Sequence, residues 1–339
     1  MSTLKQVAHL AKVSESTASR ILSQSTKDSA RYAQSTRERV LKIAQQLNYR
    51  PNMSARALAK GKSHIIALVY PRLVDSPFSA LFITQILGAV ETRCRELNYS
   101  LLISSPYLSD DGPDESYHKL LSSGYLDGII VAETLFDSSL INAALSKKIP
   151  VVAIGYGNYP HMSRSDQALG TRLIIDHLIS LGHHNLGFIS VVPEFTYITY
   201  RADKFRLALK ANGLNYNHLP QATGNLTSES GQTAAKILLD TYPEMTAIVS
   251  FNDRMAMGAL REIRVRGLRV PEDISLTGYD NLPFTADISP GLTTVDQQAE
   301  QLGREAVDQL MAVMKGQSPG LKVLEPKLII RSSTGPART

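Results

Sequence analysis

From Ile65 onward the chain alternates short apolar runs with stretches of helical periodicity. The predicted strands are Ile65–Tyr70, Ser100–Ser104, Gly128–Val131, Val151–Ile154, Asn185–Ile189, Ala247–Ser250 and Ile274–Gly278. The predicted helices between them include Leu81–Leu97, Leu169–Leu181, Arg201–Asn212 and Asp253–Arg266. Repeated βα units of this kind form parallel sheets that helices cover on both faces. About 275 residues exceed one comfortable sheet, so the pattern predicts a doubly wound α/β fold with two subdomains.

The positive charge of the chain lies at its N-terminus. The formal net charge is +5, yet residues 1–62 contain 12 Lys/Arg and 3 Asp/Glu, which is a net charge of +9 and leaves −4 for residues 63–339. A small basic segment before a mildly acidic remainder is typical of a polyanion-binding module. A basic solvated surface is the alternative interpretation of the same count.

Three apolar stripes with helical spacing lie within residues 3–47. They consist of Leu4, Val7, Ala8 and Ala11, of Ala18, Ile21 and Leu22, and of Val40, Ile43, Ala44 and Leu47. Thr3 and Ser14 are expected to cap the first two helices, and Ser35–Glu38 has the capping-box spacing for the third. Only Lys12–Ser14 separates the first two helices, which indicates a helix-turn-helix.

In a helix-turn-helix the second helix, here about Ser14–Ser23, enters the major groove with its N-terminal residues on base edges. Glu15 and Ser16 would be exposed there, and a carboxylate can accept from a cytosine amine. Arg20, one turn further along, can reach a guanine edge or a phosphate. A three-helix bundle without a nucleic-acid role is the alternative, and the charge argues against it.

Specific motifs in this segment resemble the LacI/GalR repressor family. Val7-Ala8 is followed by V-S-E-S-T-A-S-R-I-L at Val13–Leu22, and Thr36–Val40, Asn48–Asn52 and Ala55–Leu58 continue the pattern in register. Lys12 replaces the usual glycine, Ala18 replaces the common valine, and the loop Gln24–Gln34 is a few residues longer. The resemblance implies DNA contacts by Thr3, Ser14, Glu15, Ser16, Thr17, Ser19, Arg20, Asn52, Ala55, Arg56 and Leu58.

The segment Asn52–Lys60 contains good helix formers but is short. Nine residues are too few for a stable isolated helix, for which about 12–15 residues are already marginal. The segment is therefore expected to fold only against a partner. The resemblance implies that two such hinge helices pair in the minor groove, with Leu58 wedged at a base step.

The similarity continues through the rest of the chain. Family motifs match at His177–His183 (H-L-x-x-L-G-H), Asn252–Leu260 (N-D-x-M-A-x-G-A-L) and Val270–Asn281. The resemblance implies a periplasmic-binding-protein arrangement in which the chain crosses between subdomains three times, and we place the crossings near Pro160, Pro290 and Glu325. The predicted organisation is a DNA-binding domain (1–50), a hinge (51–62) and an effector-binding and dimerisation domain (63–339). Its subdomains are 63–160 with 293–324, and 161–292 with 325–332.

In open α/β sheets ligands bind at the carboxyl ends of strands, so the effector site is expected in the cleft between the subdomains. Family position and strand ends select Asp75, Phe78, Tyr156, Tyr197, Arg201, Phe251, Asn252 and Asp280. A guanidinium, an amide and a carboxylate suit vicinal hydroxyls, so a sugar is the expected ligand. Many sugar-binding relatives stack a tryptophan on the sugar, and this chain has none. Phe251, Tyr197 or Tyr156 would replace it, with core packing as the alternative for each.

Other functional classes find little support in the sequence. A single cysteine, Cys94, excludes a disulfide framework and a cysteine-based zinc site. No metal site, cofactor or catalytic residue is predicted, and His183 is explained by its place at a helix C-terminus. Gly316–Gly320 reads G-x-S-x-G, but it follows a predicted helix (Gln297–Lys315) and precedes a predicted strand (Val323–Ile330), the reverse of a nucleophile elbow.

Met1–Lys12 lacks the apolar core of a signal peptide and no apolar run spans a bilayer, so a cytoplasmic location without membrane contact is expected. Taken together, the sequence predicts a homodimeric transcriptional repressor that binds a palindromic operator and responds to a small metabolite, most simply a sugar. A purine or nucleoside effector and a corepressor mode are alternatives. A sugar-binding protein without DNA function and a hydrolase are the rival classes.

Overall fold

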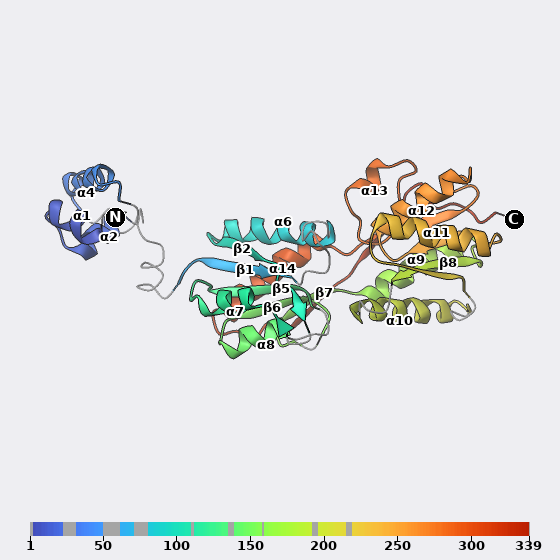
Figure 1. The fold of residues 1–339 in the computed structure, drawn as a ribbon, viewed down its shortest axis with the longest axis horizontal. Coiled ribbons are helices and arrows are strands. Elements are labelled where there is room, and N and C mark those ends of the chain that lie inside the picture. Colours follow the sequence, from blue (N-terminus) through green and yellow to red (C-terminus); the bar gives the residue numbers. More distant parts are fainter. Residues whose placement is uncertain are drawn as a thin grey trace. The chain divides into compact units, whose positions relative to one another are not determined.

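The protein is described here by a computed structural model, which covers residues 3–22, 32–49, 62–70, 81–109, 112–134, 139–157, 159–191, 196–214 and 219–338. The chain divides into two compact units, the head (residues 1–64) and the body (residues 65–339) (Figure 1). Among the described helices, none is long and apolar enough to cross a membrane.

The described part of the head consists of short helices around a small core. These are α1 (Leu4–Leu10), α2 (Glu15–Leu22) and α4 (Gln34–Gln46). The three apolar stripes predicted from the sequence meet in one cluster, whose buried members are Val7, Ala8, Ala11, Ala18, Ile21, Val40 and Ala44. Two predicted caps are confirmed. Thr3 forms a capping box with Gln6, and Ser14 Oγ accepts from the Thr17 backbone N–H at 3.1 Å.

The predicted start of the third helix is wrong. Helix α4 begins at Gln34 with Ala33 as its N-cap, and no side chain caps it. Ser35 therefore already lies within the first turn and cannot be the capping residue. Glu38 instead accepts from the Gln34 side-chain amide at 3.0 Å, which is an (i, i+4) pair that supports the same turn.

The N-terminal part of the body is built on a six-stranded parallel sheet with the order β13-β7-β6-β5-β1-β2. Its strands are β1 (Ile65–Val69), β2 (Ser100–Ser104), β5 (Gly128–Thr134), β6 (Val151–Gly155), β7 (Met162–Ser165) and β13 (Leu321–Leu324). Side chains alternate between the two faces of a strand, so Ile66 and Leu68 join one core cluster while Ala67 and Val69 join another. This explains the near-continuous apolar runs in the sequence.

Helices cover both faces of this sheet (Figure 1). They are α6 (Leu81–Glu96) and α14 (Ala299–Val313) on one face, and α7 (Glu115–Ser122) and α8 (Ser139–Ser146) on the other. A short antiparallel pair, β3 (Leu108–Ser109) and β4 (Gly112–Pro113), precedes α7.

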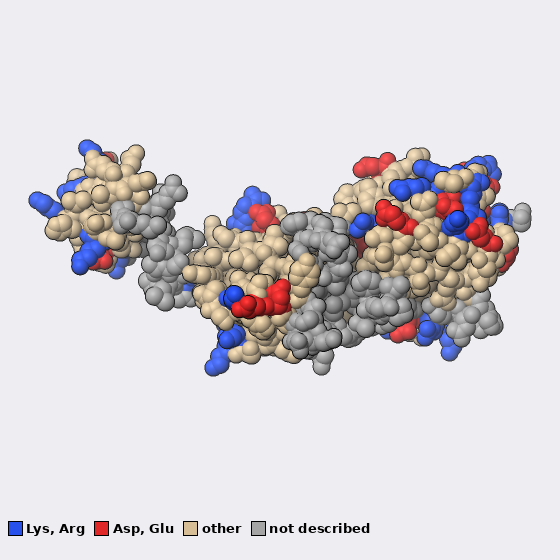
Figure 2. Space-filling model, viewed as in Figure 1, with Lys and Arg blue, Asp and Glu red and all other residues tan. Residues whose placement is uncertain are grey.

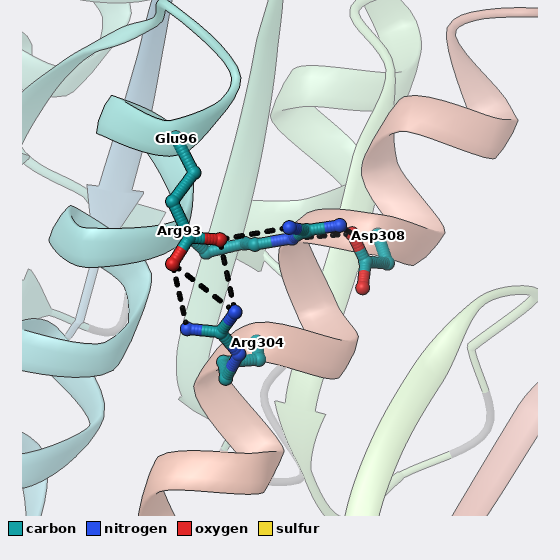
Figure 3. A network of polar contacts seen from close by, with 4 residues as sticks. All are labelled: Arg93, Glu96, Arg304 and Asp308. Carbon is teal, nitrogen blue, oxygen red and sulfur yellow. Dashed lines mark hydrogen bonds and ion pairs between the residues drawn. The ribbon is translucent and has the colours of Figure 1, made fainter.

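A half-exposed ion-pair network joins α6 to α14 (Figure 3). Arg93 contacts Glu96 at 2.8 Å and Asp308 at 2.7 Å, and Arg304 contacts Glu96 at 2.9 Å. Hydrogen bonds from Arg93 and Arg304 lower the pKa of the Glu96 carboxyl. The network links residues more than 200 positions apart in sequence and thereby fixes the register of the two helices. Its contribution to stability is small, because solvent screens exposed ion pairs.

The C-terminal part of the body is built on a four-stranded parallel sheet with the order β11-β10-β8-β9. Its strands are β8 (Leu186–Val191), β9 (Gln221–Gly224), β10 (Ala247–Ser250) and β11 (Ser275–Thr277). The helices around it are α9 (Gln167–Ser180), α10 (Thr196–Ala211), α11 (Ser228–Thr241), α12 (Asp253–Val265) and the short α13 (Phe284–Asp287). One core cluster unites the sheet with these helices.

The chain passes between the two sheets three times. The first crossing follows β7 at Ser165, because β7 pairs with β6 and β13, so the prediction near Pro160 is five residues too early. The second crossing follows β12 (Thr294–Asp296), six residues after the predicted Pro290, and the third lies between β13 and β14, at Glu325 and Pro326. The predicted strand Val323–Ile330 is accordingly two strands, β13 in the large sheet and β14 (Lys327–Ile329), which pairs antiparallel with β12.

Candidate functional site

The head exposes Lys and Arg side chains on the face shown in Figure 2. In its described ranges the exposed ones are Lys5, Lys12, Arg20, Arg39, Lys42 and Lys62, with Arg37 half-buried, against the acids Glu15 and Glu38. Arg39 also has an internal role, because its Nε donates to the Ala11 carbonyl at 2.9 Å and thereby joins α4 to the end of α1. The remaining basic groups are suited to contacts with phosphates.

The N-terminal turn of α2 and its cap carry four of the seven predicted DNA contacts that lie in described residues. Ser14 Oγ lies 2.9 Å from Ser16 Oγ and 2.9 Å from Thr17 Oγ1, so three hydroxyl groups form one small cluster. Glu15 is exposed at the start of the helix, where a carboxylate is favoured by the helix dipole. The structure brings these residues together on one turn.

Of the other predicted DNA contacts, three lie in described residues and four do not. Arg20 is exposed one turn further along α2, and its Nη1 lies 3.5 Å from Tyr32 Oη. Ser19 is half-buried beside it, and Thr3 is exposed at the start of α1. The predicted hinge contacts Asn52, Ala55, Arg56 and Leu58 lie outside the described residues.

In the body, predicted effector residues gather at the carboxyl ends of neighbouring strands. Strands β10 and β11 are parallel and in register, with Val249 opposite Thr277. Phe251 and Asn252 directly follow β10, and Asp280 follows β11. These residues therefore reach the same edge of the four-stranded sheet, as predicted. Asp75 and Phe78 lie outside the described residues, as does the side chain of Tyr197.

Arg201 of α10 lies at the centre of this edge and is 8% exposed. Its guanidinium carbon is 4.3 Å from the centre of the Phe251 ring and 3.9 Å from that of Tyr279. Nη1 donates to the Phe251 carbonyl at 2.7 Å, whereas the buried Nε has no hydrogen-bond partner among the described residues. Cation–π packing and one hydrogen bond thus hold the group in place, and a buried donor is left without a partner among the described residues. A void of only about 10 Å³ lies beside it, between Ser250, Phe251 and Tyr279 and the core side chains Ile174, Phe188 and Phe205.

Only the oxygen of the Asn252 side-chain amide is used by a hydrogen bond within the described residues. Its Oδ1 accepts from the Met255 backbone N–H at 2.8 Å and caps α12. Because the oxygen is used by the cap, the amide NH₂ is the group that can serve a ligand. The residue therefore offers two donor hydrogens at the strand ends.

Asp280 has an unusual backbone conformation, with φ of +118°, and Asn281 after it has φ of +51°. Both angles are in a region that non-glycine residues rarely adopt, so surrounding contacts must maintain them. The Asp280 N–H donates to Val295 O at 2.9 Å, and its Oδ1 accepts from Gln297 Nε2 at 2.7 Å. These contacts fix the carboxylate at the second crossing.

Asp253 is a residue that we did not predict. It is fully buried, and its two carboxylate oxygens accept from Thr294 Oγ1 at 2.6 Å and from the Leu282 N–H at 2.8 Å. Burial raises the pKa of this carboxyl to about 6, although the hydrogen bonds from Thr294 and Leu282 oppose the shift. Asp253 thus ties the start of α12 to the loop that carries Asp280 and to the crossing strand β12. The sequence feature that could have identified Asp253 is its position directly after Asn252 in the N-D motif.

Tyr156 follows strand β6 of the six-stranded sheet, whereas Phe251, Asn252 and Asp280 follow strands of the four-stranded sheet. The ring is buried at the end of β6, its Oη donates to the Ser165 carbonyl at 2.7 Å, and Arg164 lies 5.7 Å from the ring centre. These contacts stabilise the first crossing. They favour the packing alternative for Tyr156, while the ligand contact stays a prediction.

Two further motifs have structural explanations. His183 is buried, and its ring nitrogens lie 2.9 Å from Thr246 Oγ1 and 2.9 Å from the Gly335 carbonyl, so it joins the C-terminal segment to the second sheet. Within the described residues no group of three or more His, Cys, Asp or Glu side chains could hold a metal ion. Gly316–Gly320 is an exposed connection from α14 to β13, which is the helix-to-strand order predicted.

Comparisons with known proteins agree with this architecture. Residues 3–52 match the family described as bacterial regulatory proteins, lacI family, and residues 175–334 match the periplasmic binding protein-like domain. The HTH-type transcriptional repressor CytR of Escherichia coli (strain K12) is 30% identical, over 98% of this chain and 96% of that protein.

Solved structures give the same result over the whole fold. A lac repressor dimer bound to operator and the anti-inducer ONPF is 28% identical with a TM-score of 0.84, over 98% of this chain and 99% of that one. A complex of the transcriptional regulator CelR with cellobiose is 27% identical with a TM-score of 0.70, over 98% and 100% of the two chains. This chain belongs to the LacI family of bacterial transcriptional regulators.

Proposed function

We propose that this chain is a cytoplasmic, homodimeric repressor, without enzymatic activity, whose affinity for a palindromic operator is set by a small sugar bound in the body. The observation that carries the sensing part is Arg201, a buried guanidinium held by two aromatic rings with its Nε open. The NH₂ group of Asn252 and the Asp280 carboxylate lie at the same sheet edge. Donors and an acceptor converging beside aromatic rings suit the hydroxyls and apolar face of a sugar.

The DNA part of the proposal assigns the α2 turn to the major groove and the surrounding Lys and Arg side chains to phosphates. Operator binding is then steeply salt-dependent, because each neutralised phosphate releases counterions. The lac repressor structure bound to operator and the CelR complex with cellobiose support the two halves of the proposal by similarity.

Replacing Arg201 with lysine tests the sensing site. Lysine keeps the charge but loses the planar set of donors, so the affinity for the effector is expected to fall about 10- to 150-fold, as for the loss of a hydrogen bond to a charged group. A thermal-shift screen against sugars, sugar phosphates and purines first identifies the ligand, since a ligand at 100 times its Kd adds about 2.7 kcal/mol. Titration of wild type and variant then gives the two affinities.

Arg206→Lys is the matched control for this experiment. Arg206 lies on the same helix, α10, and pairs at the exposed surface with Asp203 at 3.5 Å. This variant is expected to bind effector like the wild type, and both variants are expected to bind operator. Equal effector affinity for Arg201→Lys and wild type would remove Arg201 from the site.

The dimer part of the proposal rests on a face of α12. A cavity of about 330 Å³ is lined by Met257, Leu260, Arg261, Arg264, Val265 and Ile288. Val265 is 73% exposed, which is unusual for an apolar side chain beside other apolar groups. We assign this face to a second copy of the chain, by similarity to the lac repressor dimer.

Met257→Asp is expected to convert the dimer into monomers at micromolar concentration, because a carboxylate would be desolvated in the interface. Sedimentation equilibrium measures the mass, and circular dichroism verifies the fold. Leu207→Asp, at a 58% exposed position of α10, is expected to leave the mass unchanged. A dimeric, folded Met257→Asp variant would place the interface elsewhere.

A further inference from the structure

The N-terminal turn of α2 carries one carboxylate, that of Glu15. Glu15 is exposed, and it makes no hydrogen bond or ion pair within the part of the chain that the structure describes. The neighbouring hydroxyls of Ser14, Ser16 and Thr17 are hydrogen-bonded to one another at 2.9 Å. In this turn Glu15 therefore offers two acceptor oxygens that no described residue uses, and each hydroxyl can still form a further hydrogen bond.

A carboxylate that faces duplex DNA has few favourable partners. Phosphate oxygens repel it, and so do guanine N7 and O6 and thymine O4 on the floor of the major groove. Only the amines of cytosine N4 and adenine N6 donate there. Adenine also presents the acceptor N7 beside its amine, whereas the major-groove edge of cytosine carries the donor alone. Cytosine is thus the base that best matches a carboxylate.

We infer that Glu15 selects cytosine at one position of each operator half-site. The inference rests on the proposed operator binding and names a determinant of its sequence preference. The Lys and Arg side chains of the head provide affinity for any sequence through phosphates, while Glu15 lowers the affinity for sequences that place an acceptor opposite it. The carboxylate acts as much by excluding wrong bases as by binding the right one.

Selection of random duplexes by the purified chain, followed by sequencing, tests the inference. The wild type is expected to enrich a palindrome with cytosine at one symmetric position. Glu15→Gln is expected to change that position to adenine, because glutamine can bond to both adenine N6 and N7. Fluorescence anisotropy with the four duplexes that differ at this position should give about 5- to 150-fold discrimination for the wild type and a changed order for the variant.

Glu38→Gln is the matched control, since it removes the same charge from the head at an exposed position of α4. It is expected to enrich the wild-type sequence. If Glu15→Gln and wild type enrich the same base at every position, the inference is overturned while operator binding stands. If the wild type enriches no palindrome, the proposed operator binding fails and the inference with it.

Discussion

Replacing Gly258 with alanine is expected to destabilise the body by about 3 kcal/mol or more, at the upper end of overpacking effects. Gly258 lies in α12 where that helix packs against α11, and a Cβ there would lie 1.8 Å from the Ser228 carbonyl oxygen and 2.6 Å from Gln232 N. The reciprocal glycine, Gly231 of α11, has the Met255 carbonyl oxygen 2.1 Å from its own Cβ position. The atoms in the way belong to the backbone, so only separation of the two helices can make room.

Thermal unfolding followed by circular dichroism measures this effect, and the midpoint is expected to fall by about 6 °C or more. Gly88→Ala is the control, because Gly88 lies within α6 and has nothing within 4 Å of its Cβ position. Alanine is the better helix former by up to about 1 kcal/mol, so this variant is expected to be as stable as the wild type or more stable. A Gly258→Ala variant with the wild-type midpoint would contradict the close packing of α11 and α12.

The second large effect concerns the pH dependence that Asp253 gives to stability. Its pKa in the folded protein is raised to about 6 by burial, above the ordinary value of 3.8. The stability due to this group is therefore complete below about pH 4 and is lost as the pH rises through 6, since the unfolded state ionises first. The difference of about two pKa units corresponds to about 3 kcal/mol. Asp253→Asn removes this titration, so relative to wild type the variant should gain about 3 kcal/mol between pH 4 and pH 7.

Urea unfolding of both proteins at pH 4, 5, 6 and 7 measures the change, and Asp273→Asn serves as the control. Hydrogen bonds from Arg269 lower the pKa of Asp273 to about 2, so this carboxyl is ionised in both states across most of the same range. The difference between Asp273→Asn and wild type is expected to stay nearly constant from pH 5 to pH 7. A similarly constant difference for Asp253→Asn would show that the buried carboxyl does not titrate as argued.

The strands and helices were largely predictable, because burial on both faces of a parallel sheet leaves a strong apolar signal. Strand β10 agrees with its predicted bounds, and α12 ends one residue early. Strand β7, in contrast, has the sequence Met-Ser-Arg-Ser and no apolar run. It is held by backbone pairing with β6 and β13, which a local pattern cannot reveal, and this moved the first crossing away from Pro160.

The candidate effector site was likewise predictable only in part. Strand ends placed Asn252 and Asp280 at one edge, whereas Arg201, selected by family position, reaches that edge from within α10. What the sequence could not show is which of their atoms the fold already uses, such as Nη1 of Arg201 and Oδ1 of Asn252. These hydrogen bonds depend on contacts between residues 50 positions apart or on cap geometry, and they reduce each side chain to its remaining donors. The buried role of Asp253 depends in the same way on Thr294, 41 positions away.

The three crossings between the sheets of the body have a mechanical consequence. The first and third are joined where Asp166 N donates to the Leu324 carbonyl at 2.9 Å, and the second and third are joined by the pairing of Asp296 with Lys327. Tethers that are bonded to one another act as a single joint, which resists sliding and permits rotation. The effector that we propose at Asp280 would therefore bind next to this joint, where a small displacement corresponds to a larger one at the far end of either sheet.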